Sequence, residues 1–342
     1  MKKFEDSLLP FLFENTPIRG NIVHLNDTYH EVMQHPTLPL VLKQALGELM
    51  AASALLSATL KMDGAMVLQL QSKGALKLLV VECSSNLAMR ATAKWSDEIK
   101  DQSFLELVAN GQFVITLDPK EGDAYQGIVP IEGETIAEML QNYMLRSQQI
   151  DTTLWLHCDG KNASGMLLQK LPEQILPNKP EYDADAWNRF NQLANTLTND
   201  ELQNLAPEVL LTRLFVEEDI RLFESRPTQF LCSCSKIKVA SMLKMLGIEE
   251  VENMLAEQDN IEVNCDFCNK QYVFDAIDAA VVFNEKAVFV DIKTAHYRLI
   301  NGALLIYEPF TLLIFTIRIF STQICQNLSF IPHQRLTIFT RV

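Results

Sequence analysis

Basic side chains are scarce in this sequence, in which 29 lysines and arginines stand against 43 aspartates and glutamates for a formal net charge of -14. Nucleic-acid binding depends on lysine and arginine displacing the counterions of phosphates, so this deficit argues against a phosphate-binding surface. The same negative charge is repelled by anionic membranes. We therefore expect neither nucleic acid nor membrane among the partners of this chain.

The motifs of several enzyme classes are also missing. The sequence contains no glycine-rich loop that would cradle a phosphate, no nucleophile elbow and no helix motif of the zinc hydrolases. Because no pattern in the chain favours turnover, we predict a protein that is not an enzyme.

An uninterrupted apolar segment of the secretory kind is lacking as well. The opening stretch MKKFEDSLLPFLFEN has two lysines, but Glu5, Asp6 and Pro10 interrupt the apolar run that a secretory signal needs. We therefore expect a cytoplasmic protein. In that reducing compartment, clustered cysteines bind metal or act in redox chemistry more often than they form permanent disulfides.

Several cysteines and histidines stand apart from any motif. A lone cysteine beside apolar residues is more often a small hydrophobic side chain than a nucleophile. We predict that role for Cys83, Cys158 and Cys325. The histidines of one loop-like stretch match no metal or triad spacing, and we predict surface or capping roles for them. They are His24, His30 and His35.

Apolar residues are plentiful, at 48% of 342 residues, which is enough for a sizeable core. Residues 39–62 are dense in alanine and leucine and predict a long buried helix, and residues 64–82 predict a hairpin around the turn SKG. Further elements are expected as strands at 111–119 and 152–160 and as an amphipathic helix at 134–149. Strands and helices follow no regular βαβ order, so the predicted fold class is α+β, with a core domain over residues 1–178.

A shift in composition at ILPNKPEYDADAW marks a domain boundary, after which residues 179–231 predict a helical linker. Thr198 and Glu201 form the pattern of a capping box, and residues 207–223 predict a further helix that begins at a proline. The linker holds five basic and ten acidic side chains. Like charges weaken isolated helices, so these helices are expected to depend on packing against another part of the chain.

Two close cysteine pairs follow the linker: Cys232-x-Cys234, then thirty residues, then Cys265-x-x-Cys268. Thiolate is a soft ligand that suits zinc, and four sulfur ligands leave no open position for water or substrate. The residues between the pairs have helical spacing, followed by a strand that leads into the second pair. The pattern predicts a small zinc-binding domain over residues 232–283 with Zn²⁺ on these four cysteines.

The C-x-C spacing differs from the two C-x-x-C knuckles of a purely structural zinc ribbon. A zinc-bound sulfur is a thiolate, the nucleophilic form, and an oxidised Cys232 would have a resolving partner two residues away. Oxidation of both pairs would expel the ion, and so small a domain would unfold without it. A passive zinc clamp has the same spacing, and spacing alone does not choose between the two.

Several stretches in order along the chain resemble the heat-shock protein 33 family of redox-regulated chaperones. They are LGELMAASALLSATLK, ITLDPKEGDAYQGIVPIEGETIAEML, LANTLTNDELQNL, LLTRLFVEEDIRLF, FLCSCSKIKV and IEVNCDFCNKQYVFD, and the resemblance covers about residues 4 to 283. It implies an α+β core, a helical linker and a carboxy-terminal zinc domain. The zinc ligands of the family correspond to Cys232, Cys234, Cys265 and Cys268.

The resemblance implies a holdase that consumes no ATP and acts under oxidative stress. On oxidation the family pattern implies disulfides Cys232 to Cys234 and Cys265 to Cys268, release of zinc and unfolding of a metastable linker. Apolar surface then binds unfolding client proteins. The family also implies a homodimer when active.

The chain departs from the family pattern in two places. Asn86, Ala88 and Ala91 stand where we expect glycines, which leaves the detail of that turn open. Residues 284–342 resemble nothing in the family, hold six basic and three acidic residues, and include the β-prone run FTLLIFTIRIF, too short for a membrane span. We predict a poorly ordered, non-native extension whose deletion leaves zinc binding intact.

Two other functions fit parts of the pattern. A thiol-disulfide oxidoreductase using Cys265 and Cys268 predicts a strand-to-helix setting, whereas CDFCNKQYVF leads into strand-like residues. A zinc-ribbon nucleic-acid binder predicts a basic face, but residues 232–283 carry four basic and nine acidic side chains. The redox-regulated chaperone is the leading hypothesis.

Overall fold

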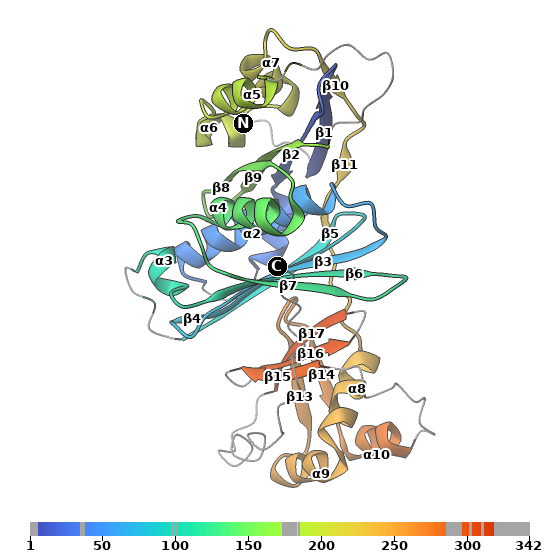
Figure 1. Ribbon diagram of the computed structural model, residues 1–342. Coiled ribbons are helices and arrows are strands. Elements are labelled where there is room, and N and C mark those ends of the chain that lie inside the picture. Colours follow the sequence, from blue (N-terminus) through green and yellow to red (C-terminus); the bar gives the residue numbers. More distant parts are fainter. Residues whose placement is uncertain are drawn as a thin grey trace. The chain divides into compact units, whose positions relative to one another are not determined.

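The computed structural model describes residues 6–34, 38–96, 99, 102–172, 183, 185–284, 296–300, 303–308 and 311–317. The chain divides into two compact units, one over Met1–Ser233 with Pro309–Thr311 and one over Cys234–Glu308 with Leu312–Val342. Figure 1 shows the elements of both. The predicted α+β class is confirmed, because helices and mainly antiparallel strands mix without βαβ repeats.

The first unit contains two sheets. In the first sheet the order is β10-β1-β2-β9-β8, with β11 also paired to β1. Its main strands are β1 (Ser7–Phe13), β2 (Ile18–Leu25), β8 (Thr152–Cys158) and β9 (Ala163–Lys170). The second sheet has the order β12-β5-β4-β3-β6-β7. Its main strands are β3 (Gly64–Gln71), β4 (Leu76–Ser84), β5 (Ala88–Trp95), β6 (Gln112–Pro119) and β7 (Tyr125–Pro130).

Helix α2 (Leu40–Ser57) forms the centre of this unit and contacts strands of both sheets. Small alanines let strands of both sheets approach closely, and thirteen of its eighteen residues are buried. Among the described residues, α2 is also the one helix long and apolar enough to cross a membrane, and 72% of it is buried inside the protein. It is therefore the predicted buried helix of residues 39–62, confirmed as a core element.

Shorter helices complete the core. They are α1 (Asp27–Val32), α3 (Phe104–Leu107) and α4 (Ile136–Tyr143), the last continued by a π-helical turn over Met144–Gln148. The predicted hairpin is present as β3 and β4, which pair antiparallel from Ala65 with Ser84 to Gln71 with Leu78. The strands predicted at 111–119 and 152–160 correspond to β6 and β8.

Three linker helices pack on the face of the first sheet that α2 leaves free. They are α5 (Ala186–Ala194), α6 (Asn199–Asn204) and α7 (Pro207–Leu214). Phe13 of β1 stacks on Phe190 with ring centroids 4.0 Å apart and meets Phe215 edge-on at 4.9 Å. The capping box of Thr198 and Glu201 is present as predicted. The acidic helices thus depend on an aromatic cluster that they share with the sheet.

The helix predicted over residues 207–223 is shorter than expected, because α7 ends at Leu214. Ile220–Leu222 instead forms β10, which pairs with β1, and the chain continues as β11 (Arg226–Pro227) and β12 (Gln229–Phe230). Three consecutive acidic residues precede β10, and negative charge at a helix carboxyl end opposes the helix dipole. The open edge of β1 offers the hydrogen bonds that the helix would have supplied.

The second unit contains α8 (Lys236–Leu246), α9 (Ile248–Glu257), β13 (Ile261–Cys265), β14 (Gln271–Phe274) and α10 (Ala276–Asn284). Gly247, with φ of 93°, separates α8 from α9 in a backbone conformation that favours glycine. Three strands from the segment 284–342 join this unit's sheet, in the order β14-β13-β17-β16-β15. They are β15 (His296–Ile300), β16 (Ala303–Glu308) and β17 (Thr311–Ile317). Much of that segment lies outside the described residues, so its predicted disorder, like the predicted division into four segments, stays a prediction.

Candidate metal and redox centre

The first cysteine pair continues directly from a strand of the core. Strand β12 runs parallel to β5, with Gln229 opposite Ala88 and Phe230 opposite Met89. The N–H of Leu231 then donates to the carbonyl of Met89 at 3.0 Å. The backbone immediately before Cys232 is therefore fixed to the second sheet.

The second pair lies in a tight turn between β13 and β14. Cys265 ends β13, its N–H donates to the carbonyl of Lys270 at 3.0 Å, and the N–H of Asn269 donates to the carbonyl of Cys265 at 2.7 Å. Asn269 has a positive φ of 56°, a conformation that asparagine tolerates. Phe267 between the two cysteines is fully buried and anchors the turn. The motif therefore has a strand-turn-strand setting.

The four sulfur atoms come together. The Sγ atoms of Cys232, Cys234, Cys265 and Cys268 all lie within 4.8 Å of one another. Those of Cys234 and Cys268 are 3.3 Å apart. Zinc–sulfur bonds of about 2.3 Å at tetrahedral angles separate sulfurs by about 3.8 Å, so the cluster has the size and the donor chemistry of a Cys₄ zinc site.

Two side chains outside the motifs contact these sulfurs. The hydroxyl of Tyr272 on β14 donates to Cys234 Sγ at 3.0 Å. Burial raises the pKa of this phenol, and the adjacent Cys234 raises it further, so Tyr272 remains a proton donor. The Arg90 guanidinium on β5 donates to Glu82 at 2.7 Å and contacts Cys232. Burial lowers the pKa of Arg90, and Glu82 with Cys232 raises it by more.

The sequence analysis identified neither side chain, although the residue pattern of each strand contains a signal for it. Along β14 the buried residues alternate with exposed ones, which places Tyr272 on the same face of the hairpin as Cys265. Arg90 is a buried charge in the strand AMRATAKW, in which the other charge, Lys94, is half-buried near the end. The contact of Arg90 with Cys232 joins segments far apart in the sequence, and no local pattern contains it.

Comparisons with known proteins agree with the fold and with the cluster. Residues 6–275 match the profile of the family described as Hsp33 protein. The chain is 58% identical over 288 residues to the 33 kDa chaperonin of Methylobacillus flagellatus, covering 84% of this chain and 97% of the relative. It is 43% identical over 294 residues to that of Chromobacterium violaceum, covering 85% and 98%. The chain belongs to the Hsp33 family.

A solved structure shares the fold of this Hsp33-family chain. The crystal structure of the 33 kDa chaperonin (heat shock protein 33 homolog) from Thermotoga maritima matches it with a TM-score of 0.70 at 21% sequence identity, covering 81% of this chain and 97% of that one. The curated relatives carry the name of a chaperone, and the cysteine cluster is compatible with zinc binding and with redox-sensitive thiols. The resemblance stated from the sequence is confirmed.

The isolated cysteines described by the structure lie apart from the cluster. Cys83 and Cys158 are buried, and burial raises the pKa of their thiols to about 12 and about 11. They are small core side chains, as predicted. Cys325 lies outside the described residues.

Of the two roles predicted for the histidines, His24 has the capping role and not the surface role, because it is 3% exposed and contacts the last turn of α6. Its Nε2 lies 2.8 Å from the carbonyl oxygen of Leu202 in α6, and burial lowers its pKa. The side chain thus connects the first sheet to a linker helix. His30 is exposed in the last turn of α1, in agreement with the prediction, and His35 lies outside the described residues.

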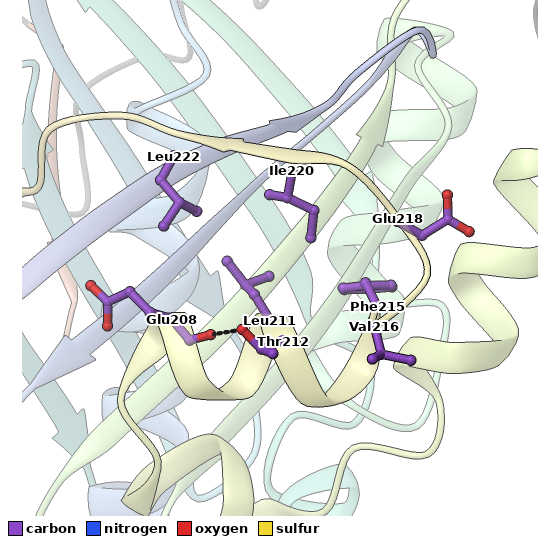
Figure 2. Close-up of a pocket in the computed structure, with 8 residues that line it drawn as sticks. All are labelled: Glu208, Leu211, Thr212, Phe215, Val216, Glu218, Ile220 and Leu222. Atoms are coloured by element: carbon purple, nitrogen blue, oxygen red, sulfur yellow. Dashed lines mark hydrogen bonds between the residues drawn. The ribbon is translucent and has the colours of Figure 1, made fainter.

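A small pocket lies at the end of the linker, between α7, the loop after it and β10 (Figure 2). Its volume is about 230 Å³ and its lining includes Leu211, Phe215 and Ile220. Ligand pockets usually have volumes of about 300 to 1,000 Å³, so this one is too small for a cofactor. It is a gap at the edge of the aromatic cluster.

Proposed function

We propose that this chain is a redox-regulated molecular chaperone that holds unfolding proteins without consuming ATP. The observation that carries the proposal is the cluster of four sulfurs, whose first pair continues directly from the strand β12 on the core sheet. Oxidation of the cluster would therefore affect the segment that follows β12, a strand whose backbone is paired with the core sheet.

In the reduced protein the four ligands would be Cys232, Cys234, Cys265 and Cys268. Zinc bound there supplies folding free energy to the second unit and keeps the sulfurs as thiolates. The thiolate of Cys232 accepts a hydrogen bond from Arg90, and that of Cys234 accepts one from Tyr272. These contacts hold the C-x-C segment in place.

Oxidation converts the thiolates to two disulfides, Cys232 to Cys234 and Cys265 to Cys268. Each pair gives up two electrons as one S–S bond forms, and hydrogen peroxide accepts them with two protons to give two water molecules. A disulfide sulfur carries no charge and does not replace a thiolate as a zinc ligand. The second unit then loses the folding energy of the site.

Loss of the site releases the linker. Helices α5, α6 and α7 cover an apolar face of the first sheet that includes Phe11, Phe13 and Ile22. Their polar faces are acidic and each helix is short, so we place them in the least stable part of the first unit. Release of the helices exposes aromatic surface to unfolded or partly folded clients. A homodimer as the active form and a cytoplasmic location belong to the same proposal.

The alternatives have weaker support. The strand-turn-strand setting of Cys265 and Cys268 differs from the strand-to-helix setting of the thiol oxidoreductase alternative. The acidic surplus around the cluster opposes the nucleic-acid binder. Neither alternative gives a function to the apolar sheet face that the linker helices cover.

The test is light scattering from a thermally unfolding client, with the full chain added either reduced and zinc-loaded or oxidised with peroxide. We expect suppression by the oxidised form alone. Cys232→Ser should weaken zinc binding, because a hydroxyl is a poorer zinc ligand than a thiolate, and should abolish the switch. Cys83→Ala, which removes a buried sulfur outside the cluster, is the matched control. Equal suppression by both forms, or unchanged metal content and switching in Cys232→Ser, would contradict the proposal.

A further inference from the structure

Tyr272 occupies an unusual place beside the sulfur cluster. In the β13–β14 hairpin it lies opposite Val263, and the alternation of buried residues places its side chain on the face that also carries Cys265. The residue is 6% exposed. The hairpin that supplies one cysteine pair therefore also supplies a hydroxyl to the other pair.

The contact made by this hydroxyl is specific to one sulfur. Tyr272 Oη donates to Cys234 Sγ at 3.0 Å, and the same sulfur lies 3.3 Å from Cys268 Sγ. The Lys270 ammonium stands over the Tyr272 ring, 5.5 Å from its centroid. A cation is attracted to the face of an aromatic ring, so this contact helps to hold the ring in place beside the sulfur. The acceptor is a thiolate in the zinc-bound state, which makes the hydrogen bond charge-assisted.

Oxidation of the pair begins at a sulfur lone pair. The thiolate attacks one oxygen of hydrogen peroxide, so that an S–O bond forms, the O–O bond breaks and the departing hydroxide takes a proton to become water. The second thiolate then attacks the sulfenic sulfur, forming the S–S bond and releasing the other oxygen as water after protonation. A hydrogen bond to the attacking sulfur withdraws electron density from the lone pair that must react.

We infer that Tyr272 is a positioning residue that holds the Cys234 thiolate in the reduced state and slows its reaction with peroxide, thereby setting how fast the switch responds to oxidant. The inference rests on the proposed function for its biological meaning. The effect of the hydrogen bond on the reactivity of the Cys234 sulfur does not depend on that function. Tyr272 thus lowers the reaction rate of a thiolate that is half-exposed.

The test uses the full chain with Tyr272→Phe, which removes the hydroxyl and retains the ring beside Lys270. Tyr143→Phe is the matched control, because Tyr143 is also buried and its hydroxyl bonds Gln148 at 3.1 Å, with no cysteine sulfur as its partner. Each protein is loaded with Zn²⁺, treated with excess hydrogen peroxide and followed with a zinc indicator dye. Parallel samples are loaded with Co²⁺ to record the sulfur-to-metal charge-transfer absorption.

We expect Tyr272→Phe to bind one metal ion per chain and to release zinc roughly three- to tenfold faster than the unsubstituted chain, since a hydrogen bond to a charged group is lost. The charge-transfer band should move to longer wavelength, because the sulfur lone pair rises in energy without its donor. Tyr143→Phe should change neither quantity.

Equal release rates and an unshifted band in Tyr272→Phe would overturn the inference. So would equal acceleration in both variants, which would mean general loosening of the chain. The assay of client aggregation tests the proposed function separately. If the oxidised, unsubstituted chain fails to suppress aggregation while Tyr272→Phe still releases zinc faster, the chaperone proposal fails and the role of Tyr272 stands.

Discussion

Arg90 lies in the second sheet with 2% of its side chain exposed, and Glu82, directly opposite on β4, is its ion-pair partner. A buried ion pair contributes little net stability, but removal of one partner leaves the other as an uncompensated charge. The guanidinium also contacts Cys232, so Arg90 interacts both with a carboxylate inside the sheet and with the first cysteine of the cluster. Substitution of this residue should therefore affect both.

We expect Arg90→Met to lower the free energy of unfolding by about 3 kcal/mol, because Glu82 remains at 15% exposure without a partner. Urea denaturation of the reduced, zinc-loaded chain measures this loss. The double variant with Glu82→Leu should recover part of it, since neither charge is then left alone. If the double variant loses as much as the sum of the single ones, the ion pair is not the cause.

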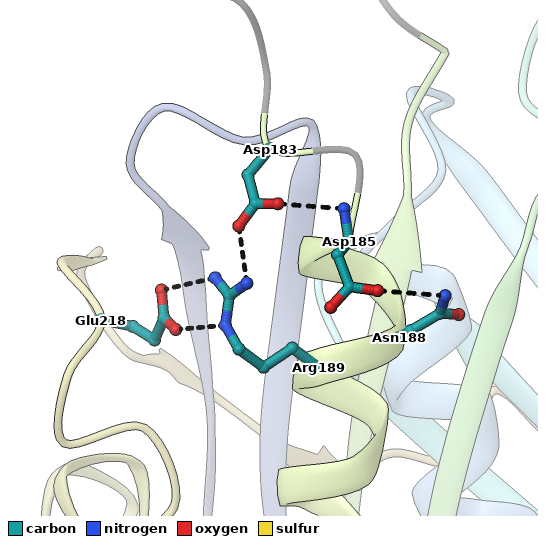
Figure 3. A network of polar contacts seen from close by, with 5 residues as sticks. All are labelled: Asp183, Asp185, Asn188, Arg189 and Glu218. Carbon is teal, nitrogen blue, oxygen red and sulfur yellow. Dashed lines mark hydrogen bonds and ion pairs between the residues drawn. The ribbon is translucent and has the colours of Figure 1, made fainter.

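At the scale of elements, the linker helices are stabilised by a capping box, by hydrogen bonds to the core such as that between His24 and the Leu202 carbonyl, and by a polar network within the linker. Thr198 and Glu201 form a reciprocal capping box at the start of α6. Arg189 of α5 donates to Glu218 at 2.9 Å and to Asp183 at 2.6 Å, which ties α5 to the loop after α7 (Figure 3). These contacts stabilise the linker helices themselves, whereas the aromatic cluster and the contact of His24 with Leu202 hold the helices on the sheet.

Thr198→Ala should destabilise α6 by about 1 kcal/mol, because the Glu201 N–H loses its side-chain acceptor. Amide hydrogen exchange over Asn199–Asn204 reports this change as faster exchange in the reduced protein. The control is Thr212→Ala, since the exposed Thr212 hydroxyl bonds the Glu208 carbonyl within α7 and caps nothing. Similar exchange in both variants would show that the box does not stabilise the linker.

The linker should also weaken in acid. Hydrogen bonds from Thr198 lower the pKa of Glu201 below its usual 4.5, and Arg189 lowers that of Asp183 below its usual 3.8. A carboxyl whose folded pKa is depressed contributes stability above its unfolded pKa and loses it as the pH falls through the folded pKa. We therefore expect linker helicity, followed by circular dichroism, to decline below about pH 4. The decline should become shallower in Asp183→Asn, and an unchanged profile would exclude this carboxyl as a contributor.

At the scale of the whole molecule, the segment beyond residue 283 is the part that the family pattern does not cover. Strand β17 in this segment pairs with β13, and Phe315 lies opposite Cys265. Strand β13 also pairs with β14 over four residue pairs. The hairpin that presents the second cysteine pair therefore retains a complete partner without the segment.

A chain shortened to residues 1–283 should bind zinc as the full chain does, because the four ligands and the β13–β14 hairpin are all retained. Zinc content after competition with a chelator provides the measurement. Loss of zinc on shortening would mean that β17 supports the site and that the segment is not a dispensable extension.

Elements with a strong local pattern were predicted well. The alanine-rich stretch gave a buried helix, the alternating apolar residues around SKG gave a hairpin, and Thr198 with Glu201 gave a capping box. Each depends on residues close together in the chain, for which period and capping are sufficient signals. The end of α7 and the burial of His24 were missed because their partners, β1 and Leu202, come from distant segments.

The same division applies to the candidate site. Sequence alone determined the four cysteines, their grouping into two close pairs and the soft-ligand chemistry that suits zinc, because these properties belong to the residues and their spacing. Only the tertiary structure decided that Tyr272 donates to Cys234, that Arg90 contacts Cys232 and that the first pair continues from a core strand. Such contacts join distant segments of the chain, and they exist only when sheets and turns bring those segments within hydrogen-bond distance.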